Sequence, residues 1–224
     1  MRARPDPARR PTGPLVTAAT CALTFTALTV YVVARAPVTG LDRQVQTFVL
    51  GHRTPWLNAL LEAWTWLGST LVLVPVLLAA SAYLVRNPHD RHGWYATASL
   101  WIAFGGAIVL YQTFKAIFGR ARPPVSQMLT HASGYAYPSG HATQAITIWG
   151  LLAVLAATDP RWRARGVPIF VAAGTVVALV GVSRVYLGVH WLTDVIAGYA
   201  LGATWLALLL ALTRATGTLP ARAR

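Results

Sequence analysis

The sequence is poor in charged residues and in cysteine. Only 11% of its 224 residues are charged, whereas a soluble domain carries about 25%. The single cysteine, Cys21, can form no disulfide within the chain, so cysteine usage indicates no redox compartment. We expect it to be a small buried apolar residue. The scarcity of charge counts against a soluble protein.

Apolar residues instead gather in long runs. Hydrophobic residues make up 55% of the chain, and most of the runs reach the roughly 17 to 25 residues that a membrane-spanning helix needs. We therefore expect an all-α polytopic membrane protein with six transmembrane helices in a bundle. The runs are Leu15 to Ala34, Thr70 to Val85, Trp94 to Phe118, Ala142 to Ala157, Val167 to Leu187 and Val195 to Leu212.

The first run resembles a secretory signal peptide, because arginines precede it and Ala34-Arg35-Ala36 has the form of a cleavage site. Its apolar core is longer than the roughly 7 to 15 residues of a signal peptide. Pro37 would also directly follow the cut. We expect a retained first helix.

The net charge of +13 invites a nucleic-acid interpretation, which the distribution of the basic residues disfavours. With a cytoplasmic N-terminus, twelve of the nineteen lie in the termini and in two short loops on one side. This is the pattern of the positive-inside rule. We expect a basic cytoplasmic tail over 1–13, a membrane domain over 14–213, a second basic tail over 214–224, and no nucleic-acid partner.

The segment between the first two runs predicts interfacial helices. LDRQVQTFVL and WLNALLEAWTWL are amphipathic and are separated at Thr54-Pro55. Glu62 could line a site or lie at the interface, and we favour the interface.

Alternating the runs across the membrane brings the polar residues at membrane depth to one end. They lie at the end of the third run, the start of the fourth, the end of the fifth and the start of the sixth, all on the outer face. Ionisable groups within or beside spans are costly and are candidates for a functional site. They are Lys115, Arg122, Ser139, His141, Arg184, His190 and Asp194.

These residue types favour an anionic ligand. Lys115 and Arg122 are seven residues apart and would share a helix face if the helix continued that far. Ser139 is a natural N-cap, and Gly140 allows a close approach to a helix start, where free N–H groups attract anions. Phosphate is the obvious ligand.

The histidines supply reactivity. His190 and Asp194 have the i, i+4 spacing that places both on one face of a helix. The carboxylate could then hold one ring nitrogen and leave the other free to attack. His141 could protonate a leaving oxygen and later accept a proton from water. No metal is needed.

Three segments resemble the signature motifs of the type 2 phosphatidic acid phosphatase superfamily. They are KAIFGRARP (Lys115 to Pro123), PSGH (Pro138 to His141) and SRVYLGVHWLTD (Ser183 to Asp194), which match K-x6-R-P, P-S-G-H and S-R-x5-H-x3-D at every defined position. The six-span arrangement is similar to that of the membrane branch, the lipid phosphate phosphatases.

The resemblance implies a role for each motif residue. His190 would form a phosphohistidine, Asp194 would orient it, and His141 would protonate the leaving group. The phosphoryl oxygens would be held by Lys115, Arg122, Ser139, Gly140 and Arg184. The implied reaction is metal-independent and cofactor-free hydrolysis of phosphatidic acid, phosphatidylglycerol phosphate or undecaprenyl diphosphate at the extracytoplasmic face of the cell membrane.

Two alternatives stay open. A non-catalytic lipid-phosphate binding or transport protein could use the same fold, although it would need no nucleophile. A soluble vanadate haloperoxidase shares the anion site, but six apolar runs count against it. The sequence does not indicate an oligomeric state.

Residues outside the motifs carry weaker expectations. His52, His89, His92 and His131 are taken as loop residues. Arg120 could touch a head group, and a solvated loop arginine is at least as plausible. Gly198 and Gly202 form a G-x-x-x-G pattern, which we expect to pack within the bundle.

Overall fold

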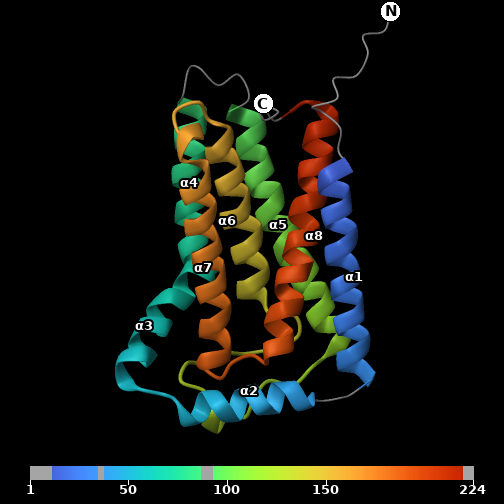
Figure 1. Cartoon of the computed structure of the whole chain (residues 1–224), viewed down its shortest axis with the longest axis vertical. Helices are drawn as coiled ribbons and strands as arrows, with labels where there is room; N and C mark the ends of the chain where they lie inside the picture. The colour runs from blue at the N-terminus through green and yellow to red at the C-terminus, as the bar shows by residue number, and fades with distance from the viewer. Residues whose placement is uncertain (1–11, 35–37, 87–92, 219–224) are drawn as a thin grey trace, which may run out of the picture.

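The computed structural model describes residues 12–34, 38–86 and 93–218. Within these ranges the chain is helical apart from turns and loops, and no strand occurs. Long helices stand side by side, and α2 lies across one end of them (Figure 1). The start of α1 and the end of α8 both lie at the opposite end. The predicted all-α class is confirmed.

Five helices are long and apolar enough to cross a membrane. A sixth crossing is possible if α3 (Pro55–Thr65) and α4 (Thr70–Arg86), which meet at an angle of 51°, count as one bent span. The predicted six-span bundle therefore fits, with one broken member. The five are α1 (Thr12–Ala34), α5 (Gly93–Phe118), α6 (Gly140–Thr158), α7 (Gly166–Tyr186), preceded by a short turn from Arg163, and α8 (Leu192–Thr216).

The bend between α3 and α4 has a local cause. A short 3₁₀ turn, Trp66–Gly68, ends α3, and the Ser69 hydroxyl accepts from the N–H of Val72 at 3.3 Å to cap α4. Gly68 packs so closely that a Cβ there would lie 2.5 Å from Val180 Cγ1 and 3.1 Å from the His141 carbonyl oxygen. The bend therefore follows the surface of α6 and α7.

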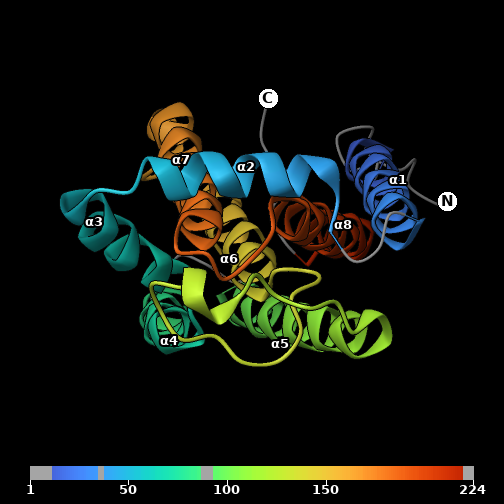
Figure 2. The ribbon, with the colours of Figure 1, turned by 90° about the horizontal axis from the view of Figure 1, so that it is seen from below.

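α2 (Gly40–Gly51) is an amphipathic helix outside the bundle. Its start is a capping box, in which Asp42 N–H donates to Thr39 Oγ1 at 3.1 Å and Thr39 N–H donates to Asp42 Oδ2 at 3.3 Å. Figure 2 shows it lying across the ends of α7 and α8, which it contacts. The predicted break at Thr54-Pro55 is confirmed, because α3 begins at Pro55.

α6 is the central helix, packed against α5, α7 and α8. Its contact with α8 depends on two glycines, as the G-x-x-x-G pattern predicts. A Cβ at Gly198 would lie 2.6 Å from the Ser139 carbonyl oxygen. At Gly202 it would lie 2.6 Å from the Thr143 carbonyl oxygen. Backbone atoms cannot move aside cheaply, so only glycine allows this approach.

One predicted helix end is wrong and another is confirmed. α8 begins at Leu192, so His190 lies in the turn before it and not on its first face. α5 ends at Phe118, where the third apolar run ends, so the helix does not continue to Arg122 and the two cations do not share a helix face. Gly119, with a φ of 58°, ends the helix in a left-handed conformation that favours glycine. His89 and His92, which we expect in loops, lie outside the described residues.

Replacing Gly202 by alanine should lower the stability of the purified protein in detergent. The new methyl group meets the backbone of α6, and overpacking of this kind costs about 1–3 kcal/mol. Thermal unfolding measures the effect.

Gly174→Ala is the matched control, because Gly174 is exposed on α7 and no atom lies within 4 Å of the position that its new methyl group would take. Its unfolding free energy should change by no more than about 1 kcal/mol. Equal destabilisation by both substitutions would show that close packing of α6 on α8 is not what Gly202 provides.

Candidate functional site

Four segment ends meet at the end of the bundle that α2 covers, as the sequence predicts. The end of α5, the start of α6, the end of α7 and the turn before α8 surround a cavity of about 490 Å³. Figure 2 looks onto this end, with α2 along one side and the α5–α6 connection along the other. Of the predicted site residues, six line the cavity: Lys115, Arg122, Gly140, His141, Arg184 and His190.

Arg122 is held in the cavity wall by main-chain oxygens. Its Nη1 donates to the Val189 carbonyl at 2.6 Å, Nε to Gly134 at 2.9 Å and Nη2 to Ser133 at 2.9 Å. Nη1 also lies 3.2 Å from His190 Nε2. Although Arg122 lies beyond the end of α5, these bonds direct its guanidinium to the histidine.

The contacts of His190 define its tautomer. A guanidinium can only donate, so Nε2 facing Arg122 carries the lone pair. The proton is then on Nδ1, which lies 3.3 Å from Asp194 Oδ2. The predicted pair therefore forms even though His190 precedes the helix. It forms because Oδ2 also accepts the Trp191 N–H at 2.9 Å, which folds the turn back onto the start of α8.

His190 is 2% exposed. Burial lowers its pKa well below 6.5, and the neighbouring charges of Arg122, Lys115 and Arg184 lower it further. The imidazole is therefore neutral at physiological pH, and the Nε2 electron pair faces Arg122 Nη1 in the lining of the cavity.

The other two cations reach the cavity from α5 and α7. Lys115 Nζ donates to the carbonyl of Tyr135 and, at 3.3 Å, to that of Ala136. Arg184 Nη1 donates to Thr65 Oγ1 at 2.7 Å. The Arg184 Nε is buried and has no hydrogen-bond partner among the described residues. Thr65, at the end of α3, thus accepts a hydrogen bond that holds Arg184 in place.

The start of α6 forms the third wall. Ser139 is the N-cap residue, as predicted, but its side chain does not cap the helix. In the part of the chain that the structure describes, the buried Ser139 hydroxyl has no hydrogen-bond partner. Gly140 lies against the ring of Tyr111, and His141 is the second residue of the helix. The first N–H groups of α6 have no carbonyl of the same helix to bond, so an anion could accept from them.

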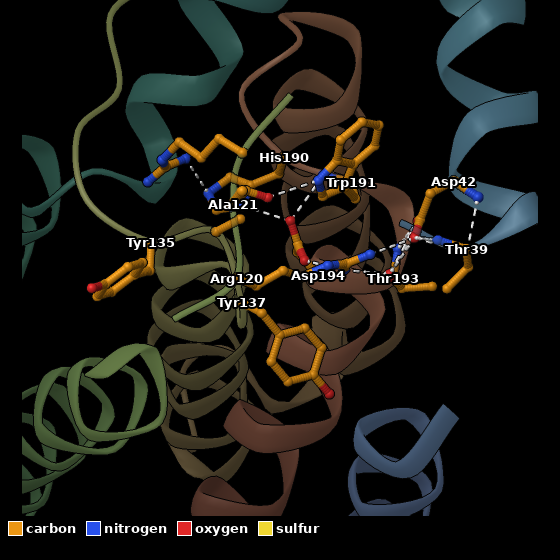
Figure 3. A network of polar contacts seen from close by, with 12 residues as sticks. Thr39, Asp42, Arg120, Ala121, Tyr135, Tyr137, His190, Trp191, Thr193 and Asp194 are labelled. Atoms are coloured by element: carbon orange, nitrogen blue, oxygen red, sulfur yellow. Dashed lines mark hydrogen bonds and ion pairs between the residues drawn. The ribbon is translucent and has the colours of Figure 1, made fainter. Parts of the chain in front are cut away.

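Arg120 corrects the expectation of a solvated or head-group arginine. It is 6% exposed and lies between two carboxylates (Figure 3). Its Nη1 donates to Asp194 Oδ1 at 2.5 Å and its Nη2 to Asp42 Oδ2 at 2.6 Å. Sequence reasoning missed Asp42 altogether. The one available signal was that Asp42 lies three residues after Thr39, which is the spacing of a capping box. In the structure this carboxylate is also buried.

The structure also places two residues outside the motifs. His131 lies in a loop, as expected, but it lines the cavity. Glu62 is exposed on α3 and is not among the residues that line the cavity, in agreement with an interfacial position. Polar residues that sequence reasoning did not single out also line it, namely Thr70, Tyr111, Gln112, Ser133, Tyr135 and Gln144.

The cavity combines three cations with three histidines, His131, His141 and His190, and a helix start. The carboxylate nearest to it, Asp194, lies behind His190 and is fully buried. A cavity of this kind favours a doubly charged anion, for which phosphate chemistry is the best match. A neutral imidazole with its lone pair on the cavity side and a second histidine are the groups that covalent and acid–base catalysis require.

Comparison with known proteins gives consistent results. Residues 94–217 match the PAP2 superfamily. Phosphatidylglycerophosphatase B of Bacillus subtilis is 31% identical over 74% of this chain and 79% of its own length. Undecaprenyl-diphosphatase of Sulfolobus acidocaldarius is 30% identical over 87% of this chain and 90% of its own length.

A solved structure is similar as well. The crystal structure of the first transmembrane PAP2 type phosphatidylglycerolphosphate phosphatase, from Bacillus subtilis, superposes with a TM-score of 0.79 at 28% identity. The match covers 86% of this chain and 94% of the other. The family match includes all three motifs and every residue that lines the cavity except Thr70. This chain therefore belongs to the PAP2 superfamily.

Proposed function

We propose that this chain is an integral membrane phosphatase that removes the terminal phosphoryl group of a phosphorylated lipid. The observation that carries the proposal is the place of His190, whose Nε2 lies 3.2 Å from Arg122 Nη1 in the lining of a cavity that Lys115 and Arg184 also line. The phosphatase names of the relatives support it. A non-catalytic binding or transport protein is not favoured, because binding needs no oriented nucleophile.

In the first step, His190 Nε2 attacks phosphorus and the bond from phosphorus to the lipid oxygen breaks. The departing oxygen takes a proton from His141, which is protonated once the anionic phosphoryl group lies beside it, and Asp194 stabilises the positive charge that forms on the His190 ring. The three cations, the Ser139 hydroxyl and the Gly140 N–H hold the phosphoryl oxygens, whose charge is spread most widely in the transition state.

In the second step, water attacks the phosphohistidine. His141, now neutral, accepts a proton from this water, the P–N bond breaks, and inorganic phosphate leaves. The enzyme returns to its initial protonation state. The reaction needs no redox partner, and Lys115, Arg122 and Arg184 provide the positive charge that a metal ion supplies in other phosphatases.

The substrate class follows from the cavity and the relatives together. The cavity has room for a phosphate and part of a head group. The names of the relatives point to phosphatidylglycerol phosphate and undecaprenyl diphosphate, and phosphatidic acid has the same terminal phosphomonoester. All three share a terminal phosphoryl group on a lipid tail.

The basic residues support an orientation in the cell membrane. The exposed arginines of the α6–α7 connection, Arg161, Arg163 and Arg165, lie at the end of the bundle away from the cavity. Positively charged loops stay in the cytoplasm. The cavity then faces the extracytoplasmic side.

Replacing His190 by alanine should abolish phosphate release, with kcat reduced by at least about 10⁴-fold, because no other group can take the place of the nucleophile. The assay is phosphate release by purified protein in detergent from phosphatidic acid, phosphatidylglycerol phosphate and undecaprenyl diphosphate. His52→Ala is the matched control, since His52 is exposed at the end of α2 and should not affect turnover. Turnover retained in a folded His190→Ala protein would remove His190 as nucleophile.

Activity should survive a strong chelator of divalent cations. The physical reason is that the site's own side chains neutralise the phosphoryl oxygens. The measurement is kcat before and after dialysis against the chelator. A loss that an added divalent ion restores would contradict the metal-free reaction.

Single cysteines at Ser126 and Arg163 should differ in their accessibility from outside intact cells. Both positions are exposed. Ser126 belongs to the α5–α6 connection at the cavity end of the bundle, and Arg163 belongs to the α6–α7 connection at the opposite end. In a Cys21→Ala background, a membrane-impermeant thiol reagent should label the first and not the second. The reverse pattern would place the cavity on the cytoplasmic side.

A further inference from the structure

The buried charges behind the cavity form a continuous network. Arg120 bridges two carboxylates whose side chains are both 0% exposed, Asp42 of α2 and Asp194 of α8 (Figure 3). Its Nη1 also donates to Thr193 Oγ1 at 2.7 Å. The ring of Tyr137 lies next to the guanidinium, with its centroid 5.9 Å from Arg120 Cζ. The network joins α2, the α5–α6 connection and α8.

Hydrogen bonds to both oxygens of Asp42 favour the ionised carboxylate that pairs with Arg120. Its Oδ1 accepts the N–H of Thr193 at 3.0 Å, and its Oδ2 accepts from Thr39 Oγ1 at 2.8 Å. Burial tends to raise the pKa of Asp42, but the hydrogen bonds of Thr193, Thr39 and Arg120 outweigh burial and keep it below its ordinary value. A residue of the amphipathic helix therefore supplies a permanent negative charge.

The network continues to His190 through the two oxygens of Asp194. Oδ1 accepts from Arg120, while Oδ2 accepts the N–H of Trp191 and faces His190 Nδ1. With separate donors on each oxygen, the carboxylate cannot rotate without losing a charged hydrogen bond. Its orientation, and with it the orientation of the imidazole, depends on Arg120.

Arg120 differs from the cations of the cavity. It is not among the residues that line the cavity, and its side chain is only 4% exposed. It can therefore act on the phosphoryl group only through other residues. A purely structural ion pair that ties α2 to the bundle would show the same contacts, and the two roles differ in what they predict for the reaction.

We propose that Arg120 and Asp42 are positioning residues of the reaction: Asp42 fixes Arg120, and Arg120 holds the Asp194 carboxylate ionised and oriented so that His190 keeps its proton on Nδ1 and its lone pair towards the cavity. The inference rests on the proposed function. It gives α2, outside the bundle, a part in the chemistry.

The test compares Arg120→Gln, Arg120→Lys and Asp42→Asn by kcat, KM and pH profile. Arg120→Gln should lower kcat about 100-fold, the size of effect expected when the partner of a catalytic histidine is misaligned. KM should change less than about threefold, because Arg120 touches no substrate. Arg120→Lys keeps the positive charge but cannot donate to two carboxylates as a guanidinium does, and its kcat should be about tenfold higher than that of Arg120→Gln. Asp42→Asn should lower kcat by about tenfold.

The acidic limb of kcat should move to higher pH in Arg120→Gln. Without the cation, the buried Asp194 protonates more readily and can no longer accept from Nδ1–H. The other charged or titratable groups that face this carboxylate are unchanged by the substitution. They are Asp42 from α2, Lys115 from α5, Arg122 and Tyr137 from the α5–α6 connection, and His190 from the adjoining turn.

Gln46→Leu is the matched control. Gln46 lies one turn after Asp42 on the same buried face of α2, and it bonds Gln127 at 3.4 Å instead of the network. The Gln46→Leu variant should have the same pH profile of kcat as the wild type. If it lowers kcat as much as Arg120→Gln does, and neither variant shifts the acidic limb, the network is only structural and the proposal is wrong.

A second readout does not depend on turnover. ¹⁵N spectra of histidine-labelled protein, assigned with the His190→Ala variant, report which ring nitrogen carries the proton. The wild type should show the Nδ1–H tautomer at His190, and Arg120→Gln should show a mixture. An unchanged tautomer and an unchanged kcat in folded Arg120→Gln would overturn the proposal.

The two failures are distinguishable. A wild-type protein that releases no phosphate from any of the three lipids would reject the proposed function, and the tautomer would still decide the role of Arg120. A wild type that is active, is inactivated by His190→Ala and is unaffected by Arg120→Gln would reject only the positioning role. If Arg120→Gln fails to fold, Arg120→Lys and Asp42→Asn give the same comparison.

Discussion

The site depends most on the carboxylate of Asp194. It is fully buried, and every part of the residue is used. Oδ2 accepts the Trp191 N–H and faces His190, Oδ1 accepts from Arg120, and the main-chain oxygen accepts the N–H of Ser139 at 2.9 Å. One residue therefore caps the start of α8, orients the histidine, anchors the α5–α6 connection and positions the start of α6.

A buried charge of this kind is costly unless it is paired. Removing one partner of a buried ion pair typically costs about 3–5 kcal/mol, because the other charge is left without compensation. Arg120 carries two such partners, Asp42 and Asp194. The pairing also removes both carboxylates from the cavity side. The cations that line the cavity are thus left to act on an incoming anion.

The elements around the bundle contribute through single contacts. The bend between α3 and α4 places Thr65 against Arg184, and α2 places Asp42 against Arg120. α1 packs along α8. Its Thr29 hydroxyl lies 2.8 Å from the hydroxyl of Tyr137, the residue that directly precedes the Pro138-to-His141 motif. A membrane bundle gains little from apolar burial between its helices, so such polar contacts and the glycine packing at Gly202 set its geometry.

The sequence alone determined the class of the protein. Long apolar runs indicate membrane helices, because in lipid the backbone N–H and C=O groups of a span must bond each other. The motif residues can be recognised by their order and spacing, which do not depend on where each helix ends. The sequence located His141, Arg184 and His190 at one end of the bundle. It located the end of α5 at Phe118, but it placed the start of α8 too early, because the N–H of His190 bonds the Arg184 carbonyl of α7 and not a carbonyl of α8. Only the tertiary structure decided the role of Arg120, whose partner Asp42 is 78 residues away. Nothing in the local sequence distinguishes an arginine in a polar loop from one buried between two carboxylates, since that difference is made by the packing of α2 across the end of α8.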